Sequence, residues 1–395
     1  MNRKLIVFFI FVPSMFFLSG CWDSAEVNDR AIVLAWGIDK AKDKKIQIST
    51  QVITPSKISG GQEGGGGSQG KSYFVATGIG KNTLDAAEQM QTKLSRQIFR
   101  GQRRVIVIGE RLARQGLKDI LDTYSRDPRV NILSDIFVIK DGTATDFLKT
   151  SYPLENIPAI GAMKEYNQIG APQKMGFLNL LLFSTSEGIC PTMPAIIFGS
   201  PSSTKEDNRE VQSNARGFRI GGVGIFNKDL KLIGFLNEDE AKVLGWVTQK
   251  RDKLVITAFV PQKKGSISLD MNKIDSKIQP IIQRNKIKIL ITLTGRGAIR
   301  ENNTGLDLTQ LKNITLVQNT LDKQVEKTVL KTVTKVQKEY RADIFGFGNT
   351  IQRKDSHQWK SLKKNWDKEF PKAEISVKAN LTVRRIGVTG RSLIK

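Results

Sequence analysis

The clearest chemical signal in the sequence is a cysteine that follows two small residues, in Leu18-Ser19-Gly20-Cys21. Small side chains let a chain enter a narrow peptidase site, and the thiol can accept a diacylglyceryl group. Cleavage then leaves Cys21 as a lipidated first residue. Each buried methylene contributes about 0.8 kcal/mol, so two acyl chains suffice for stable anchoring. We predict covalent acyl lipid on Cys21 and no other cofactor.

The segment before Cys21 has the layout of a signal peptide. Arg3 and Lys4 form a positive start, and residues 5–17 form an apolar run. This run is shorter than the roughly 20 residues that cross a bilayer, so it fits the apolar core of an export signal. The four residues Leu18-Ser19-Gly20-Cys21 that follow the apolar run resemble a bacterial lipobox. We predict a lipoprotein signal peptide at residues 1–20 and an anchored chain on the outer face of the cell membrane; the alternative is an ordinary signal peptide with a chance cysteine.

Residue types for catalysis are sparse. His357 is the single histidine, and nothing in the neighbouring Lys-Asp-Ser-His-Gln-Trp indicates a base beside a nucleophile. Cys190 stands in an apolar stretch that favours a buried small side chain over a reactive thiol. The acidic residues 238–240 begin a helix, where carboxylates favour the helix dipole. We predict a protein that is not an enzyme, with no catalytic residue and no metal site.

The charge of the chain indicates an anionic neighbour. The formal net charge is +24, of which the signal segment holds only Arg3 and Lys4, so the chain from Cys21 keeps about +22. Nucleic acid and an anionic membrane surface are the two candidates. Export and the few interleaved aromatic residues disfavour nucleic acid. We predict contact with an anionic membrane surface and none with nucleic acid. The alternative is that the lysines only keep the protein soluble.

The chain of 395 residues is long enough for two or three domains. Apolar strand patterns alternate with helical patterns, which predicts a mixed α/β or α+β fold of mixed or antiparallel sheets flanked by helices. Strands are predicted at residues 31–38, 46–52, 73–79, 105–108, 132–139, 217–226, 230–235, 254–260, 266–271 and 287–293. A helix capped by Asn82 or Thr83 is predicted to carry an apolar face of Leu84, Ala87, Met90, Leu94 and Ile98.

Composition sets the predicted domain limits. Residues 60–70 are nearly all Gly, Gln and Ser and predict a flexible loop. Residues 150–216 are rich in Pro, Gly, Ser and Asn and predict a loop-rich stretch followed by a linker. The predicted domains, after the signal peptide, are an N-terminal α/β domain at 21–200, a middle domain at 201–270 and a C-terminal α/β domain at 271–395.

The longest predicted helix has an apolar stripe at steps of three and four residues. The stripe is Leu321, Val325, Val329, Val333, Val336 and Tyr340. Beside it run Lys323, Lys327, Lys331 and Lys335. These lysines form either a solvated face or a basic ridge against lipid or an acidic partner.

Aromatic residues near the C-terminus share a helical spacing. Trp359, Leu362, Trp366 and Phe370 lie at steps of three, four and four, which predicts one buried helix face that ends at Pro371.

At this point the chain resembles a known family, the C-subunit lipoproteins of bacterial spore germinant receptors, the GerC or Ger(x)C family. The resemblance covers most of the chain. Its motifs are Cys21-Trp22-Asp23, Glu26-Val27-Asn28-Asp29-Arg30, Gly37-Ile38-Asp39-Lys40, Asp343-Ile344-Phe345-Gly346-Phe347-Gly348, Trp359, Trp366, Phe370-Pro371 and Arg384-Arg385-Ile386-Gly387.

The resemblance implies a fold of three α/β domains and a non-enzymatic subunit of a nutrient receptor that triggers germination. Its implied partners are two integral membrane subunits, of A-type and B-type, in the inner membrane of the dormant spore. Asp23, Glu26, Asp29 and Arg30 follow the anchor. They either contact a membrane partner or only lead the chain into its first strand.

A second function class fits an exported lipoprotein, namely the solute-binding lipoprotein of a membrane transporter. That class has two similar lobes of parallel sheet around a cleft, whereas the strands here cluster unevenly and hairpins occur in both halves. Affinity of the protein for an amino acid or a sugar would favour this second class.

Overall fold

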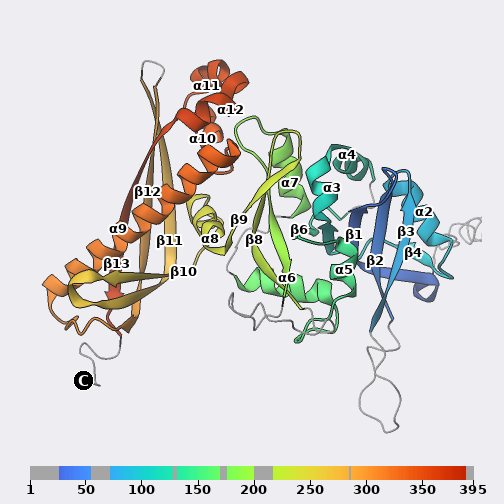
Figure 1. Cartoon of the computed structure of the whole chain (residues 1–395), viewed down its shortest axis with the longest axis horizontal. Coiled ribbons are helices and arrows are strands. Elements are labelled where there is room, and N and C mark those ends of the chain that lie inside the picture. The colour runs from blue at the N-terminus through green and yellow to red at the C-terminus, as the bar shows by residue number, and fades with distance from the viewer. Residues whose placement is uncertain are drawn as a thin grey trace, which may run out of the picture.

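The structure is a computed structural model and describes residues 26–54, 72–127, 131–169, 176–199, 217–283 and 286–387. Two β-sheets stand side by side, each with helices packed against it (Figure 1). The predicted fold class, mixed α and β with sheets flanked by helices, is confirmed. Leu18, Ser19, Gly20, Cys21 and Asp23 lie outside the described residues, as does the Gly-rich segment 60–70.

The first sheet is mixed. Its strands are β1 (Arg30–Lys40), β2 (Ile46–Ile53), β3 (Tyr73–Gly80), β4 (Gln97–Phe99), β5 (Val105–Ile108), β6 (Asp135–Lys140), β7 (Thr192–Phe198), β8 (Phe218–Phe226) and β9 (Leu232–Leu236). They lie in the order β3-β2-β1-β5-β6-β7-β8-β9, and β4 pairs with the start of β1. The central strands β1, β5, β6 and β7 are parallel, and antiparallel hairpins flank them. The continuous Val-Ile-Val-Ile of β5 is buried on both faces, as parallel central strands require.

Helices cover both faces of this sheet. They are α2 (Thr83–Gln91), α3 (Glu110–Gln115), α4 (Lys118–Arg126), α5 (Ala144–Lys149), α6 (Pro158–Gln168) and α7 (Phe177–Thr185). One core lies between the sheet and α2, α3, α4 and α7, and includes Trp36, Met90 and Tyr124. A second core lies under α5 and α6 and includes Phe137 and Phe147. The alternation of β1 side chains between these cores fixes the register of the strand.

The second sheet has the order β10-β11-β12-β13. Its strands are β10 (Leu254–Val260), β11 (Gly265–Gln283), β12 (Lys286–Asn302) and β13 (Glu374–Arg385). The β11–β12 pair is a long antiparallel ribbon, and β13 returns parallel to β12. Helix α9 (Leu311–Lys335) packs its predicted stripe against this sheet, with Leu321, Val325 and Val329 buried.

Short helices complete this half. They are α8 (Glu238–Val247), α10 (Phe347–Lys354), α11 (Ser356–Leu362) and α12 (Trp366–Glu369). The 3₁₀ turns are η1 (Val27–Asp29), η3 (Pro261–Lys263), η5 (Lys363–Asn365) and η6 (Phe370–Lys372), and a π-helical turn, η4 (Val336–Tyr340), extends α9. Helix α8 lies between the two sheets and contacts β8 and β11 (Figure 1).

The sheets divide the chain differently from the predicted domains. Strands β8 and β9, in the predicted middle domain 201–270, extend the first sheet through hydrogen bonds to β7. The predicted boundary between residues 270 and 271 falls inside β11. Sequence periodicity identifies a strand but not its distant partner, so it does not show which sheet the strand joins.

Two local predictions were wrong. The loop-rich stretch predicted at 150–216 contains α6, α7 and β7. Helix α2 ends at Gln91, so Leu94 and Ile98 are outside it, and Leu84 is 54% exposed. Asn82 is the N-cap, as predicted, and accepts a hydrogen bond from the backbone N–H of Asp85. The chain turns back after Gln91 because β4 pairs with β1, a distant contact that overrides the helical spacing.

Candidate functional site

The first sheet begins with β1 at Arg30, directly after the turn η1. Glu26 and Asp29 expose their side chains beside the turn η1. The Arg30 guanidinium lies 4.6 Å from the centroid of the Phe99 ring, and is half-buried there. Of the residues predicted to contact a partner, Glu26 and Asp29 are therefore accessible, whereas Arg30 also helps to fix β1 against β4.

Asp39 lies at the end of β1, and its carboxylate caps a helix that lies far along the chain. It accepts hydrogen bonds from the backbone N–H groups of Ala144 and Thr145 at 2.8 and 2.9 Å and from the Thr145 hydroxyl at 2.8 Å. Burial raises the pKa of Asp39, and these hydrogen bonds oppose the rise. A side chain at Gly109 would collide with this carboxylate, because its Cβ would lie 2.0 Å from Asp39 Oδ1. Asp39 therefore positions the start of α5.

The carboxylate of Asp343 holds a second, fully buried turn. It accepts hydrogen bonds from the backbone N–H groups of Phe345, Gly346, Phe347 and Gly348 and from the indole N–H of Trp366. Burial raises the pKa of Asp343, and the hydrogen bonds oppose the rise. Gly346 has φ of 75°, a left-handed conformation that glycine adopts without strain. The Asp-Ile-Phe-Gly-Phe-Gly motif is thus a tight turn built around its own carboxylate.

Aromatic side chains close over this turn. The Trp359 and Trp366 ring centroids lie 5.5 Å apart at 71°, and Trp366 and Phe370 lie 6.1 Å apart. All three are buried, as their spacing predicts. They do not share one long helix, however, because α11 ends at Leu362 and a 3₁₀ turn precedes α12.

The turn contacts the first half of the chain at one close junction. The backbone N–H of Asn349 donates to the carbonyl of Gly188 at 3.1 Å, and the N–H of Cys190 donates to the carbonyl of Asp343 at 2.6 Å. A Cβ on Gly348 would lie 2.8 Å from the Gly188 Cα. We call the contact of residues 186–190 with residues 343–349 the Gly188–Gly348 junction. Both glycines are needed for backbones to approach this closely.

Polar side chains hold the junction from outside. The Ser186 hydroxyl and Asn349 Oδ1 are 2.9 Å apart. The Lys228 ammonium donates to the carbonyls of Ser186 and Ile189 at 2.6 and 2.8 Å. Lys363 forms an ion pair with Glu187 at 3.1 Å. No sequence motif predicts a site at residues 186–190, although Gly188 close to a buried Cys190 is a signal of close packing.

The residue types considered for catalysis are His357, Cys190 and the acidic residues 238–240. His357 is exposed on α11. Burial raises the pKa of the Cys190 thiol to about 11, so at neutral pH it is the unreactive protonated form. Residues 238–240 open α8, where Asn237 and Glu240 form a capping box. In the described part of the chain, no group of three or more His, Cys, Asp or Glu side chains is arranged to hold a metal ion.

The same described residues contain no helix that is both long and apolar enough to cross a membrane.

Both halves of the chain match known protein families. Residues 23–197 match the family described as spore germination protein N-terminal domain. Residues 221–387 match the family described as spore germination B3/GerAC like, C-terminal. This chain belongs to the spore germination protein family. The first match ends inside β7 and the second begins inside β8, so the C-terminal segment supplies most of β8 and all of β9 to the sheet of the N-terminal one.

Relatives in Bacillus subtilis (strain 168) match along nearly their whole length. The spore germination protein KC is 28% identical, over 98% of this chain and 97% of its own. The putative spore germination protein YfkR is 30% identical, over 95% of each chain. The crystal structure of the GerBC protein is similar in fold, with a TM-score of 0.58, 20% identity, and coverage of 88% of this chain and 96% of that one.

Proposed function

We propose that this germination protein is the lipid-anchored C-subunit of a nutrient germinant receptor. In this proposal Cys21 carries the acyl lipid, and the folded body lies on the outer face of the inner membrane of the spore. The subunit acts through contacts rather than catalysis. It assembles with two integral membrane subunits, of A-type and B-type, and passes their response to nutrients onward.

The Gly188–Gly348 junction is the observation that carries a transmitting role. It joins the half of the chain that contains the first sheet, whose strand β1 begins nine residues after Cys21, to the half that contains the second sheet. Buried backbone hydrogen bonds, Gly–Gly contact and a caged carboxylate make this junction stiff. Helix α8, which follows β9 of the first sheet and precedes β10 of the second, connects the same two sheets covalently. In this proposal a displacement at the anchored end moves the distal sheet as well, because the junction and α8 connect the two sheets.

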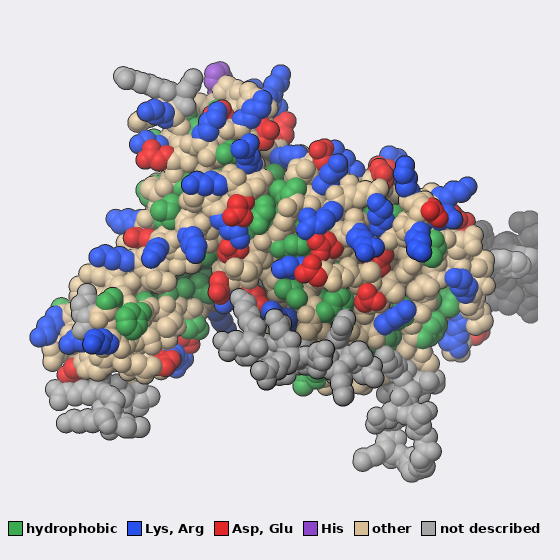
Figure 2. All heavy atoms as spheres, in the orientation of Figure 1, with side chains coloured by type: hydrophobic (Ala, Val, Ile, Leu, Met, Phe, Trp, Pro, Cys, Tyr) green, Lys and Arg blue, Asp and Glu red, His purple; other side chains and the backbone are tan. Residues whose placement is uncertain are grey.

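Lipid and charge account for the expected place of the body at a membrane. Tethering through Cys21 raises the effective concentration of the body beside membrane subunits. Lys and Arg side chains spread over the face of the molecule seen in Figure 2, with Asp and Glu between them. On α9, Lys323, Lys327 and Lys331 are exposed, whereas Lys335 pairs with Glu240 at 2.9 Å. Each well-placed basic side chain contributes about 1 kcal/mol at an anionic surface, a value extrapolated here from cytoplasmic leaflets.

The test uses two matched substitutions, Cys21→Ala and Cys190→Ala. We expect Cys21→Ala to leave the membrane fraction of spores and to lose co-purification with the two integral subunits while keeping its fold. Cys190→Ala removes only a buried thiol, so we expect it to stay in the membrane fraction. A Cys21→Ala protein that remains membrane-bound and fully assembled would contradict the proposal.

The alternative of a solute-binding lipoprotein predicts two similar lobes around a cleft. The two sheets here differ in strand number, in topology and in the helices that cover them. The comparisons place the chain in the germination family along both halves. These observations favour the receptor subunit.

A further inference from the structure

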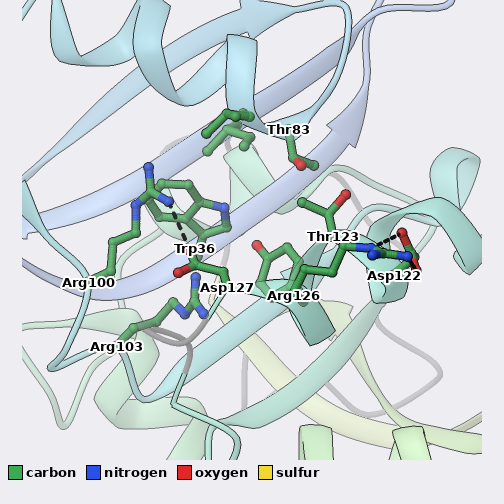
Figure 3. Close-up of a pocket in the computed structure, with 11 residues that line it drawn as sticks. Trp36, Thr83, Arg100, Arg103, Asp122, Thr123, Arg126 and Asp127 are labelled. Atoms are coloured by element: carbon green, nitrogen blue, oxygen red, sulfur yellow. Dashed lines mark hydrogen bonds and ion pairs between the residues drawn. The ribbon is translucent and has the colours of Figure 1, made fainter.

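A cavity of about 350 Å³ lies in the first sheet domain, between β1, α2 and α4. Its volume is at the lower end of the range for small-molecule sites. Trp36, Ile48, Leu84 and Tyr124 supply apolar walls. Figure 3 shows the basic side chains Arg100 and Arg103 along one side, next to the Trp36 indole.

Arg103 is the unusual member of this lining, because its guanidinium is buried and incompletely paired. The residue is 2% exposed. Its guanidinium carbon lies 5.7 Å from the Trp36 ring centroid and 5.0 Å from that of Tyr124. Its Nε and Nη2 make no hydrogen bond to any described residue. These two nitrogens form one edge of the guanidinium, whose parallel N–H groups match the two oxygens of a carboxylate.

The indole of Trp36 adds a further unpaired donor. Its Nε1 is buried and has no hydrogen-bond partner among the described residues. In Figure 3 this nitrogen lies on the side of the ring toward Thr83 and Thr123, which also line the cavity. The buried unpaired polar atoms of the lining are thus all N–H donors. A ligand that satisfies them must supply acceptors.

The acidic side chains of the cavity are already paired. Asp122 accepts two hydrogen bonds from Arg126, at 2.9 and 3.0 Å. Asp127 forms an ion pair with Arg100 at 3.5 Å. Neither pair involves Arg103, so the Nε–Nη2 edge of its guanidinium stays without an acceptor while the guanidinium lies beside the Trp36 and Tyr124 rings. A singly charged carboxylate would supply the acceptors, whereas a doubly charged phosphate would also face the two nearby aspartates.

We propose that this cavity binds a small monocarboxylate with an apolar body. The carboxylate pairs with the Nε–Nη2 edge of Arg103 and with the Trp36 N–H, and the body packs on Trp36, Tyr124 and Leu84. Both Arg103 nitrogens are closed to water in this conformation. Binding therefore includes a rotamer change of a lining side chain, a common response to ligands. The site lies within one domain and is independent of the lipid-anchored role.

The experiment is calorimetric titration of the purified, lipidated full-length protein in detergent with benzoate. Benzyl alcohol, of similar shape but uncharged, tests the need for the carboxylate, and phenyl phosphate tests the charge. We expect benzoate to bind with a Kd of about 1 mM or tighter, at least tenfold tighter than either analogue. Binding below detection at 10-fold that concentration, or tighter binding of phenyl phosphate, would overturn the proposal.

Variants locate the binding. Arg103→Met keeps the side-chain volume and removes the donors, so we expect at least a tenfold loss of benzoate affinity. Arg96→Met, an exposed neighbour outside the cavity lining, is the matched control and should bind normally. If Arg103→Met does not fold, two milder variants replace it. Arg103→Lys removes the two parallel N–H donors of the guanidinium, and Trp36→Phe removes the indole donor. Each should weaken binding several-fold. Unchanged affinity in the folded variants would overturn the proposal. Binding of an acidic peptide but not of benzoate would also overturn it, and would assign the cavity to a protein partner.

Discussion

The indole N–H of Trp366 donates to Asp343 Oδ2 at 3.0 Å, deep in the C-terminal half of the chain. The same carboxylate accepts four backbone N–H groups from the turn that follows it. Asp343 thus ties the aromatic cluster to the turn at the Gly188–Gly348 junction. The carboxylate fixes the local turn, and the backbone carbonyl of the same residue accepts the Cys190 N–H across the junction.

Asp343→Ala should be strongly destabilising. It leaves buried donors unpaired, each at a cost of about 1–3 kcal/mol, so we expect a loss of at least about 4 kcal/mol in the free energy of unfolding. Trp366→Phe removes one donor and should cost about 1–3 kcal/mol. Chemical denaturation followed by near-ultraviolet circular dichroism measures both. His357→Ala, on the exposed face of α11, is the control and should change stability by less than about 0.5 kcal/mol. Equal, small effects of all three would show that the caged carboxylate is unimportant.

Gly348→Ala should separate the junction. The added Cβ would lie 2.7 Å from Trp359 and 2.8 Å from the Gly188 backbone, so one of the two segments must move. We expect hydrogen exchange of the Cys190 and Asn349 amides to accelerate by at least about tenfold, which corresponds to about 1.4 kcal/mol.

Gly245→Ala in α8 is the matched control for that variant. Its Cβ would make only an ordinary contact of 3.4 Å with Arg251. Alanine is favoured over glycine within a helix by about 1 kcal/mol, so this variant should be neutral or stabilising. Unchanged amide exchange in Gly348→Ala would remove the support for a stiff junction.

Lys250 predicts a specific pH dependence of stability. Burial lowers the pKa of its ammonium from 10.5 to about 8. Between these values the unfolded chain binds a proton that the folded chain does not, so stability rises with pH from about 8 to about 10.5. Below pH 8 the folded protein carries the full penalty of a buried charge, on the order of 3 kcal/mol.

Lys250→Met tests this dependence. We expect the variant to be more stable than the parent protein at pH 7, and the difference to vanish as the pH approaches 10.5. Denaturation curves at pH 7, 8.5 and 10 measure it. A difference that does not vary with pH would assign the effect to packing against Phe183, whose ring centroid lies 4.4 Å from the ammonium.

Strand β13 is the last strand of the second sheet, and side chains from α9 cover its outer edge. Gln318, Asp322 and Glu326 accept hydrogen bonds from the backbone N–H groups of Val383, Leu381 and Ala379, at 2.8 to 3.0 Å. Uncovered strand edges pair with other chains. Replacing the three acceptors by alanine should therefore promote self-association, measured by sedimentation velocity. The pair Lys323→Ala and Lys327→Ala, on an exposed face of the same helix, should remain as monodisperse as the parent; equal behaviour of both variants would contradict this role.

Local periodicity predicted much of the fold. The buried stripe of α9, the hairpin β8–β9 and the capped start of α2 follow from patterns within a few residues. Predictions failed where distant contacts decide the structure. Pairing of β4 with β1 ends α2 early, and pairing of β8 with β7 assigns that strand to the first sheet.

The polar centres of the structure could be recognised as motifs but not understood from sequence. Asp39 reaches residues 144 and 145, and Asp343 reaches Trp366, so their roles depend on the complete fold. The sequence does not single out Arg103, because an isolated arginine carries no pattern. Its significance comes from burial between Trp36 and Tyr124, which only the packed structure shows.

Nutrient-triggered release of dipicolinate from spores that rely on a receptor containing this subunit tests the central claim most directly. Spores lacking the gene, spores carrying Cys21→Ala and spores carrying Cys190→Ala are compared after normal sporulation. We predict that release is lost without the gene, is strongly reduced by Cys21→Ala and is normal with Cys190→Ala. Unchanged release in the first two strains would contradict the assignment of this chain as a lipid-anchored receptor subunit.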